Sequence, residues 1–68
     1  MWWWLSFADP NRPQGQTFLG VTIVEAPDFE NALNKSWALG INPGGEVRGQ
    51  ALREAPEVQH QNRLLSRD

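Results

Sequence analysis

The chain opens with a run of large apolar side chains near its N-terminus, and this run constrains how the other residues can fold. Successive side chains of a β-strand point to opposite faces, so one face of this strand carries Trp3, Leu5 and Phe7. Trp2 and Trp4 fall on the other face. A small domain with a single helix covers only one face of such a strand. The face with Trp2 and Trp4 therefore needs a partner, a ligand or a second copy of the chain.

The size of the chain also favours self-association. The 68 residues make one small domain, and a chain of this length buries only about 60% of its unfolded surface on folding. Small domains commonly gain stability from disulfides, structural metals or oligomerisation. The sequence has no cysteine and one histidine, which leaves no disulfide, no thiolate site and a poor histidine set for zinc. Oligomerisation is the remaining route, and it agrees with the two-faced first strand.

The charge pattern argues against binding to duplex nucleic acid or to a membrane. Six basic residues stand against eight acidic ones, and after residue 45 the two signs are interspersed. Duplex nucleic acid favours a protein with a basic face. The apolar run stops at Asp9 and has no positively charged segment before it, so we expect neither a signal peptide nor a membrane span. These features predict a cytoplasmic protein.

Two strands and a loop are predicted in the first part of the chain. The first strand covers residues 1–8, and the second covers residues 17–26 after a loop with two prolines and a glycine. Alternation on the second strand places Leu19, Val21 and Ile23 on one face. We expect the helix that follows to cover this face.

An amphipathic helix is predicted directly after the second strand. Its apolar stripe has the spacing i, i+3, i+4, i+7, i+8 and consists of Phe29, Ala32, Leu33, Ser36 and Trp37. Asp28 is the expected N-cap. Gly40 is the expected residue just beyond the C-cap, with Ile41 folding back on the helix. All five residues of the stripe, Trp37 included, are expected to face the sheet.

The remaining residues predict a third strand at 46–52 and a short C-terminal helix or arm. The fold class is therefore α+β: a small three-stranded sheet in β-β-α-β order, with one helix packed on one face. A right-handed crossover through the helix favours parallel second and third strands, with the first strand between them and antiparallel to both. We expect a single domain over residues 1–52 and an arm over residues 53–68.

The junction between the second strand and the helix carries a family resemblance. The run from Gly20 to Leu33 (GVTIVEAPDFENAL) resembles the strand-to-helix junction of ferredoxin-like α+β proteins. Those include dimeric α/β-barrel proteins, whose open sheet face is closed by a second subunit. Continued through the segment NPGGEV, residues 42–47, the run also resembles small uncharacterised proteins of bacteria and their phages. The chain lacks the histidine and acid pairs of the catalytic members, so the resemblance assigns no functional residue.

Trp2 and Trp4 are the first candidates for a binding surface. Two such rings represent about 300–500 Å² if exposed, the size at which an apolar patch on a monomer indicates an interaction site. Phe18 and Val24 are expected to extend the patch, and Arg48 on the third strand is the candidate for a ligand-facing cation. The patch is either an oligomer interface, a face covered by the C-terminal arm, or a stacking platform for a planar ligand or single-stranded base.

The loop after the helix is a second candidate, for anion binding. Asn42, Gly44 and Gly45 offer consecutive main-chain amides of the kind that bind anions. The loop follows a helix instead of preceding one, however, and therefore lacks the dipole of a helix N-terminus. Its spacing matches neither a P-loop nor a dinucleotide fingerprint, so a simple turn out of the helix is the favoured interpretation.

The other polar residues form no catalytic pattern. His60 lies in a polar segment, and Ser6, Ser36 and Ser66 have no recognisable nucleophile context. Helix capping and the helix dipole explain the carboxylates at the start of the helix. We therefore expect no enzyme activity, no catalytic residue, no metal and no cofactor.

Two functional hypotheses remain. In the first, the chain is a non-enzymatic binding module that acts as a homo-oligomer through its aromatic sheet face. In the alternative, it is a phage-type protein that sequesters a small anionic aromatic ligand, such as a nucleotide, in a pocket lined by tryptophan and arginine at the oligomer interface. A foreign protein partner for the same face also stays open.

Overall fold

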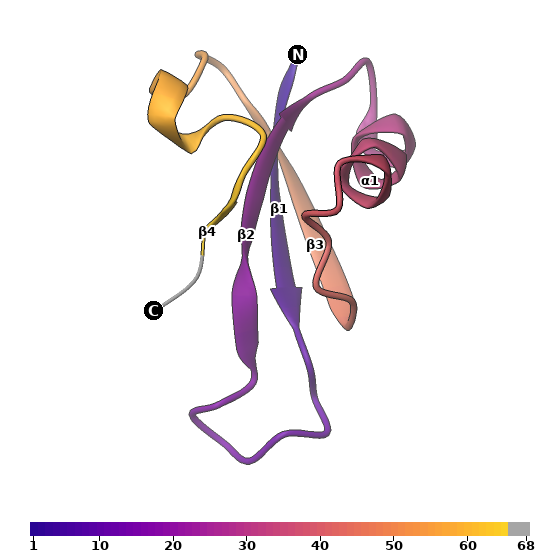
Figure 1. Cartoon of the computed structure of the whole chain (residues 1–68), viewed down its shortest axis with the longest axis vertical. Coiled ribbons are helices and arrows are strands. Elements are labelled where there is room, and N and C mark those ends of the chain that lie inside the picture. The colour runs from indigo at the N-terminus through magenta and orange to yellow at the C-terminus, as the bar shows by residue number, and fades with distance from the viewer. Residues whose placement is uncertain (66–68) are drawn as a thin grey trace.

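The computed structural model describes residues 1–65, which form an antiparallel sheet with one helix on one face (Figure 1). Ser66 and the other residues of the predicted arm beyond residue 65 lie outside the described residues. The strands are β1 (Trp2–Ala8), β2 (Phe18–Glu25), β3 (Glu46–Leu52) and β4 (Leu64–Leu65). The helix α1 spans Phe29–Ala38, and a 3₁₀ turn, η1, spans Val58–His60. No helix among residues 1–65 combines the length and the apolar character needed to cross a membrane.

The strand order confirms the predicted arrangement of the first three strands. The order is β3-β1-β2-β4, and β1 pairs antiparallel with both β2 and β3. Strands β2 and β3 are therefore parallel and are connected through α1. The prediction of three strands was wrong in one respect, since β4 adds a fourth strand beside β2. Strand β4 has only two residues, which are too few to show any alternation in the sequence.

The face of the sheet against α1 holds the apolar core. Leu5 and Phe7 are almost fully buried there. Leu5 pairs with Thr22, and Trp3 pairs with Val24, so Thr22 and Val24 lie on this same face. Val24 belongs to the core and does not extend the aromatic patch, contrary to the prediction.

The predicted helix-facing set on β2 was wrong for two of its three residues. Val21 and Ile23 pair with Ser6 and Trp4 and therefore lie on the face away from α1. Leu19 does pack against the core, because the register of β1 and β2 shifts beside it. Strand β2 is apolar on both faces because both are covered, and alternation alone could not tell them apart.

The two ends of α1 confirm their predictions. The Asp28 carboxylate accepts a hydrogen bond from the Asn31 amide at 2.8 Å, as an N-cap does. At the other end, Gly40 has a φ of 70°, its amide donates to the Trp37 carbonyl, and the Ile41 amide donates to the Ser36 carbonyl. This pair of bonds is the Schellman motif, which explains why the helix stops there.

Trp37 does not face the sheet as predicted. Ser36 of α1 is fully buried, whereas the side chain of Trp37, the next residue of the helix, is 60% exposed. One residue turns the helix by about 100°, so the step from Ser36 moves Trp37 beyond the contact with the sheet. The apolar stripe of α1 is thus narrower than the spacing indicated.

The C-terminal segment runs along the outer edge of β2 (Figure 1). The Asn62 amide donates to the Ile23 carbonyl at 2.8 Å, and Leu65 pairs with Val21. Val21 and Ile23 are only 6% and 4% exposed, although both face away from α1. The β2 half of that face is therefore buried, and the arm pairs with the edge of β2 beside it.

Candidate functional site

The face of the sheet away from α1, called the open face below, remains uncovered over β1 and β3. Alternation and the strand register place eight residues on it in this region: Trp2, Trp4, Ser6, Ala8, Glu46, Arg48, Gln50 and Leu52. In the described part of the chain, α1 packs on the opposite face and the arm pairs with β2. The open face is thus a strip two strands wide.

Trp4 is the most exposed aromatic residue of this strip. It lies in the middle of β1, between Ile23 of β2 and Gln50 of β3, and its side chain is 41% exposed. Trp2 lies one step along the same face, between Glu25 and Leu52, and is half-buried. The exposed aromatic area is therefore smaller than two fully exposed rings, and Trp4 supplies most of it.

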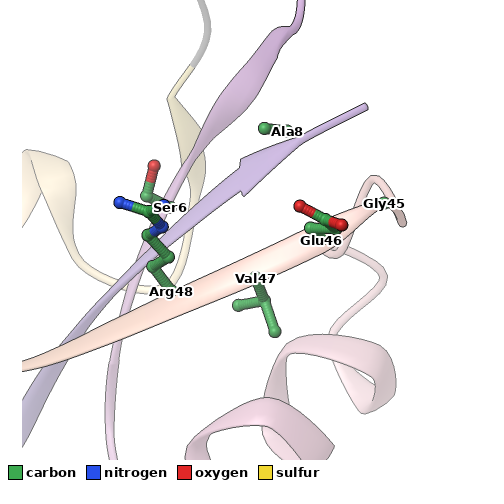
Figure 2. A pocket seen from close by; sticks show the side chains of 6 residues that line it. All are labelled: Ser6, Ala8, Gly45, Glu46, Val47 and Arg48. Carbon is green, nitrogen blue, oxygen red and sulfur yellow. The ribbon is translucent and has the colours of Figure 1, made fainter. Parts of the chain in front are cut away.

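A hollow of about 530 Å³ lies beside the aromatic strip at the start of β3. Its lining consists of Ser6, Ala8, Gly45, Glu46, Val47 and Arg48. Figure 2 shows the side chains of Arg48 and Ser6 on the same side of the sheet, whereas Val47 is directed toward the helix. The hollow thus brings together two predicted candidates, Arg48 and Gly45, that came from different arguments.

The charge of Arg48 has no carboxylate partner in the described part of the chain. Residues 1–65 contain one ion pair, in which Arg12 Nε lies 3.6 Å from Asp9 Oδ2. Glu46 lines the same hollow two residues before Arg48, but no ion pair joins them. Arg48 is exposed on the strand next to Trp4 and Ser6. An unpaired guanidinium on the strand next to an aromatic residue suits a planar anionic ligand. The guanidinium can bind a carboxylate or phosphate through two hydrogen bonds, and it can also stack on an aromatic ring.

The loop after α1 is held by its own side chain. The Gly44 amide donates to Asn42 Oδ1 at 2.7 Å, and Asn42 Nδ2 donates to the Ser36 hydroxyl at 3.0 Å. The Gly44 amide is therefore already occupied within the loop. Gly45 has a φ of 78°, and a Cβ there would collide with the Ala8 carbonyl. The structure brings Gly45, but not Asn42 or Gly44, into the lining of the hollow.

Phe18 lies at the far end of the sheet from Trp2. It pairs with Ala8, which lines the hollow, and its side chain is 41% exposed. The space above Gly20, on the neighbouring part of β2, is taken by Leu64 and the Leu65 carbonyl. Phe18 therefore flanks the hollow and is separated from Trp4 along the sheet.

Three residues of the site were missed in the sequence: Ser6, Glu46 and Gln50. Alternation from Trp2 places Ser6 on the open face, and alternation from Arg48 places Glu46 and Gln50 there. The alternation was visible in the sequence, but single polar residues on a strand cannot be assigned to a common site without the strand register. His60, in contrast, lies in η1 on the arm. Among residues 1–65 no three acidic or histidine side chains gather in a way that would hold a metal ion.

Comparisons with protein families, with curated proteins and with solved structures give no match to this chain.

Proposed function

We propose that the chain is a non-enzymatic interaction module that self-associates through the open face. The observation that carries this proposal is the position of Trp4. Its ring is 41% exposed at the centre of the sheet, on the part of the face that the arm leaves uncovered. An exposed tryptophan surrounded by β-strand, with polar residues at its rim, has the composition of a protein interface.

The energetics require more than Trp4 alone. Removing its exposed 41% from water contributes about 1.5–2.5 kcal/mol per protomer at the usual 25 cal/mol per Å². Association costs at least about 4 kcal/mol, and stable interfaces bury about 800 Å² on each partner. The chain has an accessible surface of 4838 Å², so such an interface would take roughly one sixth of it. The strip from Trp2 to the hollow, with Phe18 and Leu52 at its borders, supplies the further contacts.

A paired substitution tests the proposal. The variant Trp2→Ala with Trp4→Ala should lower the assembled fraction measured by sedimentation velocity at micromolar concentration. Trp37→Ala is the matched control, because Trp37 is 60% exposed on the helix and lies away from the open face. An equal effect of both variants, or an unchanged sedimentation coefficient in the first, contradicts the proposal.

A second function is favoured by the unpaired Arg48 beside the hollow. In this alternative the assembled protein sequesters a small anionic aromatic ligand, such as a nucleotide, without turning it over. Arg48 would hold the anion, and the ring would stack on Trp4, since the lining of the hollow contains no aromatic residue. Equilibrium dialysis against a panel of nucleotides tests this function. Failure of the assembled protein to retain any of them removes it.

A further inference from the structure

The outer edge of β3 has unpaired main-chain groups. In an antiparallel ladder the N–H and C=O of one residue point to the same neighbouring strand, and successive residues alternate. The Met1 carbonyl accepts from the Ala26 amide at 2.8 Å, so odd-numbered residues of β1 bond to β2 and even-numbered ones to β3. Trp4 and Ser6 therefore bond to their partners on β3. The intervening β3 residues, Val47, Gly49 and Ala51, point their N–H and C=O groups away from the sheet.

The outward main-chain groups of β2, on the other side of the sheet, have hydrogen-bond partners. Along β2, the Glu25 carbonyl accepts from Lys35 Nζ at 3.0 Å and the Ile23 carbonyl accepts from the Asn62 amide at 2.8 Å. Val21 pairs with Leu65. Within residues 1–65, no donor or acceptor bonds to the outward groups of β3. A strand edge of this kind is a ready template for another strand.

Several devices that protect an edge strand are absent from β3, although the strand carries the charges of Glu46 and Arg48. Its sequence, EVRGQAL, has no proline and no lysine, and its register with β1 has no shift along all seven residues. Prolines, lysines, bulges and very short strands are the means by which proteins prevent edge pairing. Strand β4 uses the last of these. The contrast between the two edges of the sheet indicates that the β3 edge pairs with a strand of another chain.

We infer that β3 pairs antiparallel with β3 of a second copy of the chain, about a two-fold axis at Gly49. Gly49 then lies opposite the partner's Gly49, and Val47 lies opposite the partner's Ala51. All three outward residues of each strand become hydrogen-bonded, and the two four-stranded sheets join into one continuous sheet. This contact is isologous, as a closed dimer requires.

Two other symmetric registers fit the residues less well. An axis at Arg48 would place it directly opposite the partner's Arg48, and like charges in that position are destabilising. An axis at Val47 would bring Gly45 into the ladder, but Gly45 has a φ of 78° and is not extended. With the axis at Gly49, Arg48 lies opposite the partner's Gln50, whose amide oxygen accepts from a guanidinium.

The helix side of the proposed axis is also suitable. The Phe29 ring lies against Gly49, where a Cβ would otherwise project, and Phe29 is half-buried. The two-fold places the ring of each protomer near the axis and gives the edge contact an apolar element. Trp4 is on the neighbouring strand and takes no part, so this contact is separate from the open-face contact proposed above.

Nuclear magnetic resonance on a mixture of labelled and unlabelled protein tests the inference. Residues opposite each other in a non-hydrogen-bonded antiparallel pair bring their Hα atoms close. An intermolecular contact between Hα of Arg48 and Hα of the partner's Gln50 is therefore expected. Amide exchange at Val47, Gly49 and Ala51 should slow about tenfold when the free protein reaches ten times its dissociation constant. Amides of Arg48 and Gln50 should be protected at every concentration, since they bond to β1.

The outcomes separate the edge contact from the open-face contact. Free exchange at Val47, Gly49 and Ala51 in a protein that assembles through Trp4 overturns the edge inference alone. Protected edge amides with a solvent-exposed Trp4 ring overturn the proposed function alone. A monomer at all concentrations overturns both. The edge amides could also become protected from exchange only after an unrelated extended peptide is added. That result would show that the β3 edge binds a strand of another protein, and it would overturn the self-pairing.

A substitution gives an independent measurement of the edge contact. Ala51→Pro removes one outward N–H, and proline is tolerated on an edge strand where the N–H faces away from the sheet. It should abolish the intermolecular contact between Arg48 and the partner's Gln50, whereas Ala51→Ser should retain it. A proline variant that keeps the contact and the edge protection contradicts the inference.

Discussion

The Phe29 ring occupies the place that a side chain at residue 49 would take, so that Gly49 on β3 and Phe29 on α1 fit only as a pair. Gly49→Ala should therefore destabilise the fold by about 1–3 kcal/mol, because the ring must move. Urea unfolding measures this cost. In a Phe29→Ala background the same substitution should cost much less. If the two effects simply add, the account of this contact is wrong.

The pairing of the arm with β2 should depend on Gly20, the glycine of β2 that lies against Leu64 and Leu65. At Gly20 a Cβ would stand 2.8 Å from the Leu65 carbonyl oxygen and 2.8 Å from Leu64 Cδ1. Gly20→Ala should displace β4 and speed the amide exchange of Asn62, which bonds to β2. Gly15→Ala is the matched control, because Gly15 also has positive φ but nothing lies within 4 Å of its added Cβ. Equal exchange at Asn62 in the two variants contradicts this prediction.

The start of α1 should respond to loss of its cap. The Asp28 carboxylate accepts from the Asn31 amide at 2.8 Å and from Asn31 Nδ2 at 3.0 Å. Asp28→Ala should lower the free energy of unfolding by about 1 kcal/mol, with Asp28→Ser close to the parent. Urea unfolding followed by circular dichroism checks the difference. An alanine variant as stable as the serine variant would show that the cap contributes nothing.

Arg48 distinguishes the two proposed functions. Arg48→Ala should leave assembly through Trp4 unchanged, because exposed charges at the rim of an interface contribute little to stability. Any nucleotide binding should be lost in the same variant, and Arg48→Lys should restore only part of it, since lysine cannot bind bidentately. Sedimentation and equilibrium dialysis give the two readouts. Loss of assembly in Arg48→Ala would contradict the placement of Arg48 at the rim and would show that it belongs to the centre of the interface.

The elements with local signals could be predicted from the sequence. Asp28 and Gly40 mark the ends of α1 through the chemistry of single residues, and the structure confirms both. The alternation of Trp2, Trp3 and Trp4 also predicts their faces correctly. Such signals depend on a few neighbouring residues and do not need the rest of the fold.

The features that depend on distant residues could not be predicted. Val21 and Val24 lie on opposite faces of β2 and are both buried, and the arm that pairs with Val21 comes some forty residues later in the chain. The hollow joins Ser6 to Arg48 through the strand register, which the spacing of the residues in the chain does not specify. Trp3 Nε1 is buried without a hydrogen-bond partner in the described part of the chain, which no sequence pattern indicates.

Native mass spectrometry of the freshly purified protein tests the central claim most directly, with a denatured sample as the mass reference. The account predicts an assembly of two or more copies at micromolar concentration, carried by the open face around Trp4. An added mass of a few hundred daltons per site would further favour the ligand-sequestering function. A bare monomer that persists at high micromolar concentration, with Trp4 still exposed, would contradict the claim.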